Sequence, residues 1–375
     1  MAIWDEVRRD FPVLERLAYL NAAAIGPIPR PVREAVDQFN RSLEEGGDRD
    51  WKQWMDRREE VRARVASFIG AAYEEIAFVP NTSAGMNLIV DMVGPAGAVL
   101  SSELEFPTVT LPFLHRGIAV HLLPAADGIV RLESFERSQA PRAATIALSH
   151  VQFSNGGRID LPAFGLIKAH RHLVISGSQS VGAFPLEVRD WEIDALACGG
   201  HKWLCAGFGA GFVYISRALL EKYPPRAVGW MSMRDPFAFD NRTIDLLPTN
   251  ARHEMGCPSF PGIIALGAAV DYLAKVGREA IANRILELNM YLTSRLTMAQ
   301  FEVLSPPDPQ RSGETLCAIP DPPRATEFLR ERGVIVTVKP DGIRISTHFY
   351  NNEEDIDRCV GALIAYRENL VSDVG

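Results

Sequence analysis

The sequence predicts an α/β protein in which a large domain with a mostly parallel, seven-stranded sheet precedes a smaller C-terminal α+β domain. Between residues 75 and 216, short apolar runs alternate with helix-length segments. The runs are nearly continuous, as expected for strands that are covered on both faces. Polar, glycine-containing motifs follow several of them, at the strand ends where open α/β sheets bind ligands. The expected strands are 76–79, 98–101, 119–123, 145–149, 172–176, 195–198 and 211–216.

Helices and a long connection account for most of the remaining chain. Segments such as 84–93 and 161–170 are expected to form right-handed crossovers between the strands. A Pro-rich, polar stretch from 224 to 258 predicts a long surface connection. Helices at 262–276 and 279–295, strands near 302–304, 314–318, 334–338 and 342–346, and a helix at 353–370 are expected to follow. We therefore expect a large domain at 15–258 and a small domain formed by 1–14 and 259–375.

The composition excludes several classes of protein. A chain of 375 residues is long enough for one large and one smaller domain. A net charge of −8 disfavours nucleic acids and anionic membranes as partners. The sequence has no apolar run of about 18 residues, which a membrane helix needs, and its charged start is unlike a secretory signal.

The cysteines indicate a reducing compartment. There are five of them, and they are scattered without a CxxC pair: Cys198, Cys205, Cys257, Cys317 and Cys359. An odd number without close spacing predicts reduced thiols, not a disulfide framework or a zinc site. We therefore expect a cytoplasmic protein without a bound metal.

The most informative motif is the run Ala-Leu-Ala-Cys-Gly-Gly-His-Lys-Trp-Leu at 195–204. It places Lys202 directly after an expected strand and two glycines. A lysine held at such a strand end can lose its proton and act as an amine nucleophile toward a carbonyl group. The glycines allow a bulky ligand to approach the backbone. The alternative is a loop lysine that points to solvent.

A second motif, Asn-Thr-Ser-Ala-Gly-Met-Asn at 81–87, follows the strand 76–79 and opens a helix. Small residues at a helix N-terminus leave backbone N–H groups free for a phosphate, and the helix dipole adds positive potential. This turn is therefore a candidate phosphate site. The alternative is a simple helix cap made by Thr82 or Ser83.

Three further strand ends carry candidate ligand groups. Phe106, which follows Glu105, could stack on a planar ring or be an ordinary core residue. His150 could contribute to the rim of the site or be a structural histidine. Gln179, three residues after Ser176, could reach a ligand hydroxyl, although Ser, Gly and Gln are also common in turns.

Arg344 interrupts an otherwise apolar strand, Gly-Ile-Arg-Ile-Ser at 342–346. A guanidinium group in this position can bind a carboxylate through two parallel hydrogen bonds. The alternative is a solvent-facing residue, since side chains alternate between the two faces of a strand.

Together these motifs resemble those of the fold-type I pyridoxal-phosphate enzymes, specifically the class V aminotransferase superfamily. That superfamily includes cysteine desulfurases, isopenicillin-N epimerase-like proteins, kynureninases and C–S lyases. The resemblance extends from Tyr19 to Asp357, and its most specific element is the Gly-His-Lys-Trp-Leu run. It implies that pyridoxal 5'-phosphate is the cofactor. It further implies that Lys202 forms the internal aldimine and moves protons at the substrate α-carbon.

The resemblance also implies roles for other residues. Ser83, the Ala84 amide and His201 would hold the phosphate. Phe106 would stack on the ring, and Gln179 would hydrogen-bond the ring oxygen. Arg344 would bind the α-carboxylate of an amino-acid substrate, with Asn21 nearby. A homodimer with shared active sites is implied as well, and it would account for the long excursion at 224–258.

Three departures from the family pattern bear on the reaction. Ser176 stands where the family has the aspartate that keeps the pyridine nitrogen protonated, and a neutral hydroxyl cannot do this by charge pairing. Gly199 and Cys257 stand where Ser or Thr commonly helps to bind phosphate, the latter usually across the dimer interface. No cysteine occurs between Val336 and Arg344, where a desulfurase carries its persulfide nucleophile.

These departures favour β-elimination, or C–S lyase-type chemistry, on a cysteine-like α-amino acid in specialised metabolism. The reason is that a carbanion that expels a good leaving group need not be stored by the ring. Epimerase-like proton exchange at Cα and transamination are the alternatives. A catalytically silent scaffold with the same fold is an alternative from another class, although the joint presence of Lys202, Gln179 and Arg344 speaks against it. Another nucleotide-binding enzyme is disfavoured, because the sequence has neither G-x-G-x-x-G nor a P-loop.

Overall fold

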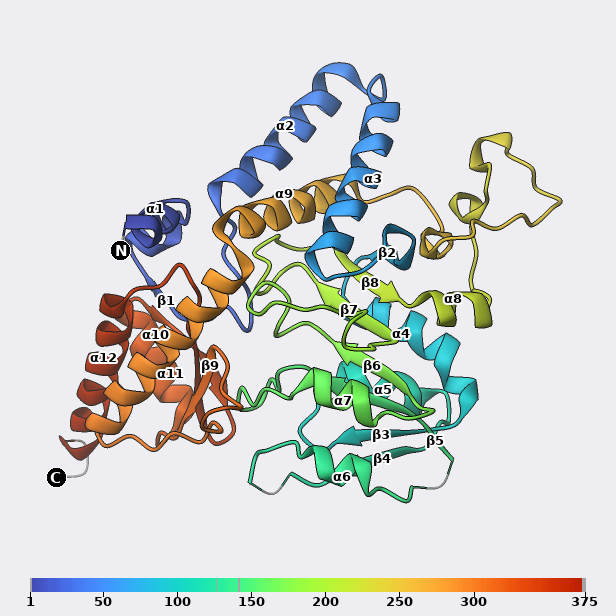
Figure 1. The fold of residues 1–375 in the computed structure, drawn as a ribbon. Coiled ribbons are helices and arrows are strands. Elements are labelled where there is room, and N and C mark those ends of the chain that lie inside the picture. The colour runs from blue at the N-terminus through green and yellow to red at the C-terminus, as the bar shows by residue number, and fades with distance from the viewer. Residues whose placement is uncertain (1, 126, 141, 373–375) are drawn as a thin grey trace.

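The computed structural model describes residues 2–125, 127–140 and 142–372, and it confirms the predicted fold class. Figure 1 shows a large sheet with helices packed around it and a C-terminal unit to one side. The large sheet has seven strands in the order β2-β8-β7-β6-β5-β3-β4. They are β2 (Ile76–Val79), β3 (Ala98–Ser102), β4 (Val120–Leu123), β5 (Ala143–Ser149), β6 (His172–Ser176), β7 (Ala195–Gly199) and β8 (Gly211–Ile215).

Strand direction brings the predicted motifs to one edge of this sheet. Five neighbouring strands, β4, β3, β5, β6 and β7, are parallel to one another. In contrast, β8 is antiparallel to both β7 and β2. Two reversals leave β2 running in the same direction as β7. The carboxyl ends of every strand except β8 therefore meet at the same edge, where open α/β sheets bind ligands.

Both faces of the sheet are buried, as the continuous apolar runs predicted, except along the edge strand β4. Successive residues point to opposite faces, so Leu100 and Leu148 enter one core while Val99 and Ala147 enter another. The first core is covered by α3 (Trp51–Phe68), α7 (Leu161–Ile167) and α9 (Phe260–Val276). The second core is covered by α4 (Thr82–Val93), α5 (Pro107–His115) and α8 (Arg217–Lys222).

Two long N-terminal helices, α2 (Arg30–Gly46) and α3, were not predicted from the sequence. For α3, a reason is visible at Arg62, whose side chain is fully buried and paired with Glu59 and Glu254. Buried charges of this kind mask the apolar spacing by which an amphipathic helix is recognised.

The helix α7 ends three residues earlier than expected. The remaining helices of the large unit are α6 (Leu132–Glu136) and the 3-10 turns η1 (Pro12–Glu15), η2 (Tyr73–Glu75) and η3 (Gly94–Ala96).

The C-terminal unit is an antiparallel sheet in the order β11-β12-β9, packed against helices. Its elements are β9 (Glu314–Cys317), β11 (Thr337–Lys339), β12 (Gly342–Ser346), α10 (Arg278–Met298), α11 (Pro322–Glu331) and α12 (Glu353–Ser372). Two expected strands differ. The one at 334–338 is divided, because β10 (Val334–Ile335) pairs with β1 (Ala18–Tyr19) while β11 pairs with β12. The one at 302–304 is reduced to a single bridge between Val303 and Cys317.

The start of the chain packs against the C-terminal unit. After α1 (Ala2–Arg9), the Phe11 ring lies 4.6 Å from the Tyr350 ring, and Arg8 donates hydrogen bonds of 2.7 and 2.9 Å to the two oxygens of Asp355. Figure 1 shows α1 and α12 on this side of the molecule. The domain limits at residues 14 and 258 remain predictions.

The predicted connection between α8 and α9 projects from the body of the protein (Figure 1). It contains only short 3-10 turns, η4 (Trp230–Ser232), η5 (Pro236–Ala238) and η6 (Asn250–His253). Within the described ranges, no helix taken singly has the length and apolar composition to cross a membrane. Only α9 and α10 counted together meet that test, and the pair is bent by 78°.

Candidate active site

The predicted site residues converge on a cavity of about 220 Å³ at the carboxyl edge of the large sheet. Six of them line it: Ser83, Phe106, Ser176, Gln179, His201 and Lys202. They come from the segments after β2, β3, β6 and β7, which the strand directions bring together. The other lining residues are Asn81, Thr82, Thr108, Ser149, Phe153 and Ser178.

Lys202 lies on the loop directly after β7, and its ammonium nitrogen is 5.9 Å from the centre of the Phe106 ring. Burial lowers the pKa of this amine to about 8; Glu314 opposes that change, and Arg344 adds to it. A desolvated lysine of this kind has an appreciable neutral, nucleophilic fraction near pH 7. The alternative of a loop lysine turned to solvent is therefore wrong.

The N-terminus of α4 faces the same cavity. Its cap is Asn81, whose side-chain oxygen accepts a 2.9 Å hydrogen bond from the Ala84 amide. The expectation of a cap at Thr82 or Ser83 is therefore wrong, and the Ala84 amide is already engaged. The amides of Thr82 and Ser83 lie in the first turn, where N–H groups lack intrahelical acceptors.

Side chains around this helix end are polar and uncharged. The hydroxyl of Ser83 lies 2.7 Å from that of Thr108. The His201 ring stacks on Phe208 with centroids 5.5 Å apart, and both burial and Lys202 lower its pKa. His201 is therefore neutral near pH 7 and can donate one hydrogen bond into the cavity.

A row of hydroxyl groups lies at the end of β6. The Ser176 oxygen is 3.4 Å from that of Ser178, which is 2.8 Å from the Thr82 hydroxyl. The described residues that line the cavity include no Asp or Glu. A neutral ligand group can therefore be hydrogen-bonded here, but a cationic ring is not stabilised by an adjacent carboxylate.

Gln179 is buried and held by two protein groups. Its amide nitrogen donates to the Ala23 carbonyl at 2.9 Å, and its oxygen accepts from the Trp203 indole N–H at 2.8 Å. One N–H of the side-chain amide remains for a ligand oxygen, because the NH₂ group has two hydrogens. The sequence left open that Gln179 is only an ordinary turn residue, whereas in the structure its side chain is held in one orientation.

Phe106 is 45% exposed at the mouth of the cavity, so the alternative of a core residue is wrong. Its ring meets the Phe153 ring edge-on with centroids 5.0 Å apart. The preceding Glu105 is buried and accepts hydrogen bonds of 2.7 Å from the Ser149 amide and 2.6 Å from the Ser149 hydroxyl. Glu105 thus ties the Phe106 segment to the end of β5. His150 does not line the cavity; it is buried near Phe184 and Trp191, and burial lowers its pKa to about 3, as for a structural histidine.

Arg344 on β12 is only 3% exposed, so the alternative of a solvent-facing residue is wrong. Its guanidinium donates to the Phe153 carbonyl at 2.8 Å and lies 3.1 Å from the carboxylate of Glu314. Asn21 lies nearby, since its backbone bridges to Ser346 and its side chain accepts a hydrogen bond from Thr337.

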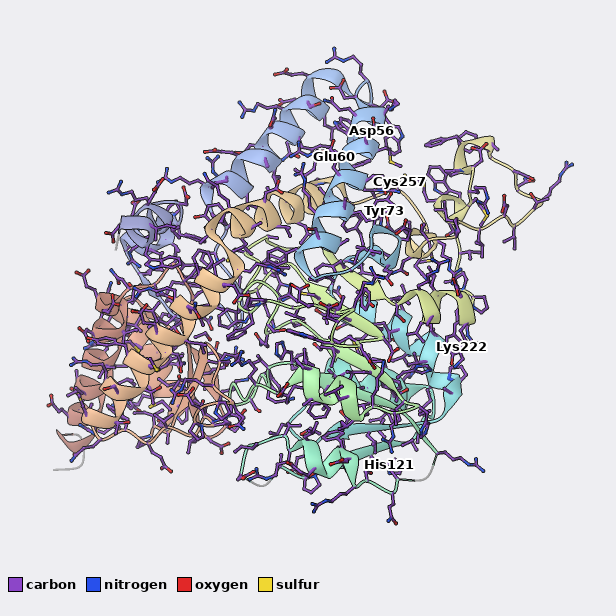
Figure 2. The ribbon with its side chains drawn as sticks, viewed as in Figure 1. Asp56, Glu60, Tyr73, His121, Lys222 and Cys257 are labelled. Atoms are coloured by element: carbon purple, nitrogen blue, oxygen red, sulfur yellow. The ribbon has the colours of Figure 1, made fainter. Side chains whose placement is uncertain are left out.

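Four of the predicted site residues are not among those that line this cavity: Asn21, Ala84, Cys257 and Arg344. Cys257 is exposed and, with Ala84, lines a separate cavity of about 460 Å³. Figure 2 shows Cys257 on the segment that leads into α9. Within one chain, Cys257 is therefore no part of the Lys202 site. The described residues also form no group of three or more His, Cys, Asp or Glu able to hold a metal ion.

Sequence reasoning missed Glu314 and Phe153. The signal for Glu314 was an acidic residue in an apolar strand, the same signal that singled out Arg344. Phe153 lies in a turn, where the sequence gives no comparable signal. Only the fold shows that its carbonyl holds Arg344 and that its ring faces Phe106.

A lysine amine, a helix N-terminus and an exposed aromatic ring around one cavity of an open α/β sheet define a fold-type I pyridoxal-phosphate enzyme. Comparison with known proteins agrees. The family model "Aminotransferase class-V" matches residues 18–359. The chain therefore belongs to the class V aminotransferase family, and pyridoxal 5'-phosphate is its cofactor.

Individual relatives span nearly the whole chain. Isopenicillin N epimerase of Amycolatopsis lactamdurans is 28% identical over 392 residues, covering 96% of this chain and 98% of the relative. A cysteine desulfurase of Escherichia coli is 29% identical over 400 residues, covering 96% and 97%.

Solved structures of the protein C-DES share the fold. A lysine-to-alanine mutant with glycine covalently linked to the PLP cofactor has a TM-score of 0.88 at 21% identity, covering 95% of this chain and 98% of that one. The complex of the same cystine C–S lyase with its product, cysteine persulfide, has a TM-score of 0.87 at 22% identity, covering 94% and 99%.

The residues present fit this cofactor. The cavity offers a largely buried amine at Lys202, first-turn N–H groups of α4 for a phosphate, and the exposed face of Phe106 for a ring. Gln179 keeps one uncommitted N–H on the same rim. Ser176 and Ser178 offer neutral hydroxyl groups that could hydrogen-bond a ring nitrogen.

Proposed function

We propose that this protein is a pyridoxal-phosphate-dependent lyase that eliminates a sulfur leaving group from the β-carbon of a cysteine-like α-amino acid. The observation that carries the proposal is Ser176, a neutral hydroxyl in a cavity whose described lining has no carboxylate. Without a charge partner the pyridine nitrogen is a weaker site for a proton, and the ring is a weaker electron sink. Elimination would depend less on such a sink than transamination does, because the departing sulfur group carries the electron pair away.

Lys202 has two tasks in this proposal. Its amine would hold the cofactor, and the same amine, when free, would take the α-proton of the substrate. A pKa of about 8 suits a general base that works near neutral pH. When bound, pyridoxal phosphate supplies the electron withdrawal that weakens the bonds at the α-carbon.

The remaining residues orient the reactants. Ser83, the first turn of α4 and His201 would hold the phosphate, and the free N–H of Gln179 would face the ring oxygen. Arg344, with Asn21 beside it, would bind the substrate α-carboxylate. Fixing that carboxylate decides which bond at Cα stands perpendicular to the ring.

A classical desulfurase mechanism is not supported. The loop between Val336 and Arg344 has no cysteine to accept sulfur. Cys257 is the exposed cysteine, and it lines the other cavity, whereas Cys198, Cys205, Cys317 and Cys359 are buried.

Proton exchange at Cα is the second candidate. The similarity to isopenicillin N epimerase favours it, and so does a second amine near the site. Burial and Arg344 lower the pKa of Lys339 to about 8, and its nitrogen lies 4.2 Å from the centre of the Phe153 ring. Epimerisation needs proton carriers on both faces of the α-carbon, and Lys339 could serve as the second.

We further propose that the protein works as a homodimer with shared active sites. Large apolar side chains on the projecting connection are exposed, including Phe237 at 50% and Phe239 and Ile244 at 73%. Exposed apolar groups of this kind are typical of protein interfaces. Sedimentation equilibrium should therefore give twice the chain mass, and a monomeric mass would overturn the dimer.

Product analysis distinguishes the candidate reactions. Purified holoenzyme is incubated in D₂O with S-substituted cysteines and a panel of other L-amino acids. Release of pyruvate and ammonia from an S-substituted cysteine identifies the lyase. Deuterium at Cα without pyruvate identifies proton exchange, and an α-keto acid that retains its sulfur identifies transamination. An unchanged cofactor spectrum with every amino acid would support a silent scaffold and overturn the proposal.

A further inference from the structure

Glu314 is a fully buried carboxylate beside the arginine that is proposed to bind substrate. It lies on β9, which pairs antiparallel with the Arg344 strand β12. One Glu314 oxygen is 3.1 Å from Nη1 of Arg344, and the two side chains are 0% and 4% exposed. The same Nη1 also donates to the Phe153 carbonyl at 2.8 Å.

This buried pair is incompletely satisfied. Among the described residues, neither Glu314 oxygen has a hydrogen-bond donor in good geometry, and Nε of Arg344 has no acceptor. Buried polar groups without partners are rare and costly in folded proteins. Arg344 therefore keeps a donor for a second carboxylate, next to the one that it already faces.

Several charges surround Glu314. They are Arg344 on β12, Lys339 on β11 and, when its amine is not bound to the cofactor, Lys202 on the loop after β7, all of them cationic groups. The turn at 152–157 also packs against Glu314, through Gly156, and carries no charged side chain. Burial raises the pKa of Glu314, and the three cations oppose that change.

A substrate carboxylate that reaches Arg344 would place a second negative charge beside Glu314. Two carboxylates beside one guanidinium in a buried site each disfavour the charge of the other. The second charge would therefore raise the pKa of Glu314 further, in the same direction as burial does.

We propose that Glu314 is a specificity-determining residue that neutralises part of the Arg344 charge in the free enzyme and takes up one proton from solvent when a substrate carboxylate binds. The carboxylate of Glu314 becomes a neutral carboxylic acid, so the net charge around Arg344 is unchanged by binding. The inference rests on the proposed function in one respect, that Arg344 receives the substrate carboxylate. It predicts that affinity for carboxylate ligands falls as pH rises, by up to tenfold per pH unit.

The test uses calorimetry on the holoenzyme with 3-(methylthio)propionate. This compound is the deamino analogue of S-methylcysteine, so it cannot react with the cofactor. Titrations at pH 6.5, 7.0 and 7.5 in buffers of different ionisation enthalpy count the protons taken up per ligand bound. We expect uptake approaching one proton for the wild type and a dissociation constant that rises up to tenfold from pH 6.5 to 7.5.

Glu314→Gln is the decisive variant, because it keeps the shape and removes the titration. Its proton uptake should fall to near zero, and its dissociation constant should be almost independent of pH and lower than the wild-type value at pH 7.5. The uncharged amide, 3-(methylthio)propanamide, should cause no proton uptake. Glu314→Asp keeps an ionisable group and should retain the proton uptake. If it does, the loss of uptake in Glu314→Gln is due to the missing carboxylate and not to a general effect of substitution at this position.

Two outcomes separate the inference from the proposal on which it rests. If Glu314→Gln takes up as many protons as the wild type, the role of Glu314 is refuted while carboxylate binding stands. If Arg344→Gln binds 3-(methylthio)propionate as tightly as the wild type, the carboxylate binds elsewhere and the proposed role of Arg344 fails.

Discussion

Lys202 should behave as an unusually nucleophilic amine in enzyme freed of its cofactor. Burial lowers its pKa from 10.5 to about 8. At pH 7 about one amine in ten is then neutral, against roughly one in three thousand for an ordinary lysine, a difference of about 300-fold. An amine with this neutral fraction can capture an aldehyde at neutral pH, as the proposed chemistry requires.

Reductive methylation with formaldehyde and cyanoborohydride, followed by peptide mass mapping, measures this amine as a function of pH. The extent of Lys202 labelling should rise with a midpoint near pH 8. Lys52, whose side chain is 88% exposed, serves as the internal reference for reagent access.

The neighbours of Lys202 should move this midpoint in opposite directions. Glu314 raises the pKa of Lys202 and Arg344 lowers it. Glu314→Gln should therefore shift the midpoint to lower pH, and Arg344→Gln should shift it to higher pH. A midpoint near 10.5 in the wild type, or shifts of the same sign in the two variants, would refute the electrostatic reasoning.

Three further predictions concern stability and reaction type. Gly156 has φ +76°, and an added Cβ would lie 2.5 Å from the Glu314 carbonyl oxygen, whereas Gly117 has φ +70° and no described atom within 4 Å. The left-handed backbone should reduce the free energy of unfolding of both Ala variants by about 1–2 kcal/mol. Only Gly156→Ala should lose a further ~1–3 kcal/mol, because its Cβ clashes with the Glu314 carbonyl. Equal losses for the two variants in urea unfolding would contradict the clash. Burial lowers the pKa of His150 to about 3, so between that value and the unfolded value of about 6.5 only the unfolded chain binds this proton. As the pH is lowered through this range, the free energy of unfolding should decrease by about 1.4 kcal/mol per pH unit more than it does in His150→Leu. Parallel pH profiles of the two proteins would argue against a buried neutral imidazole. Ser176→Asp should raise the yield of transamination product relative to pyruvate from the same S-substituted cysteine, and an unchanged ratio would remove the serine as the cause of reaction choice.

The large sheet was predictable because its strands are buried on both faces and read as continuous apolar runs. Each motif after a strand could then be placed at one edge without knowledge of the tertiary structure. Lys202, Ser176 and Gln179 meet in one cavity for this reason. The small-domain strands were less predictable, because β10 and β11 adjoin in sequence but pair with different partners, β1 and β12.

What the sequence did not reveal depends on contacts between distant segments. Glu314 pairs with Arg344 across two strands, and Phe153 holds Arg344 from a turn of the large unit. The cap at Asn81, which engages the Ala84 amide, was missed because Asn, Thr and Ser at 81–83 are all good capping residues. In each case the local pattern allowed several partners, and packing selected one.

Borohydride reduction of the holoenzyme, followed by peptide mass mapping, tests the central claim most directly. The account predicts loss of the visible cofactor band and a single reduced pyridoxyl-phosphate adduct on Lys202, with no adduct in Lys202→Ala. An adduct on Lys339 or another lysine, or a Lys202→Ala protein that keeps both its absorption band and its activity, would contradict it.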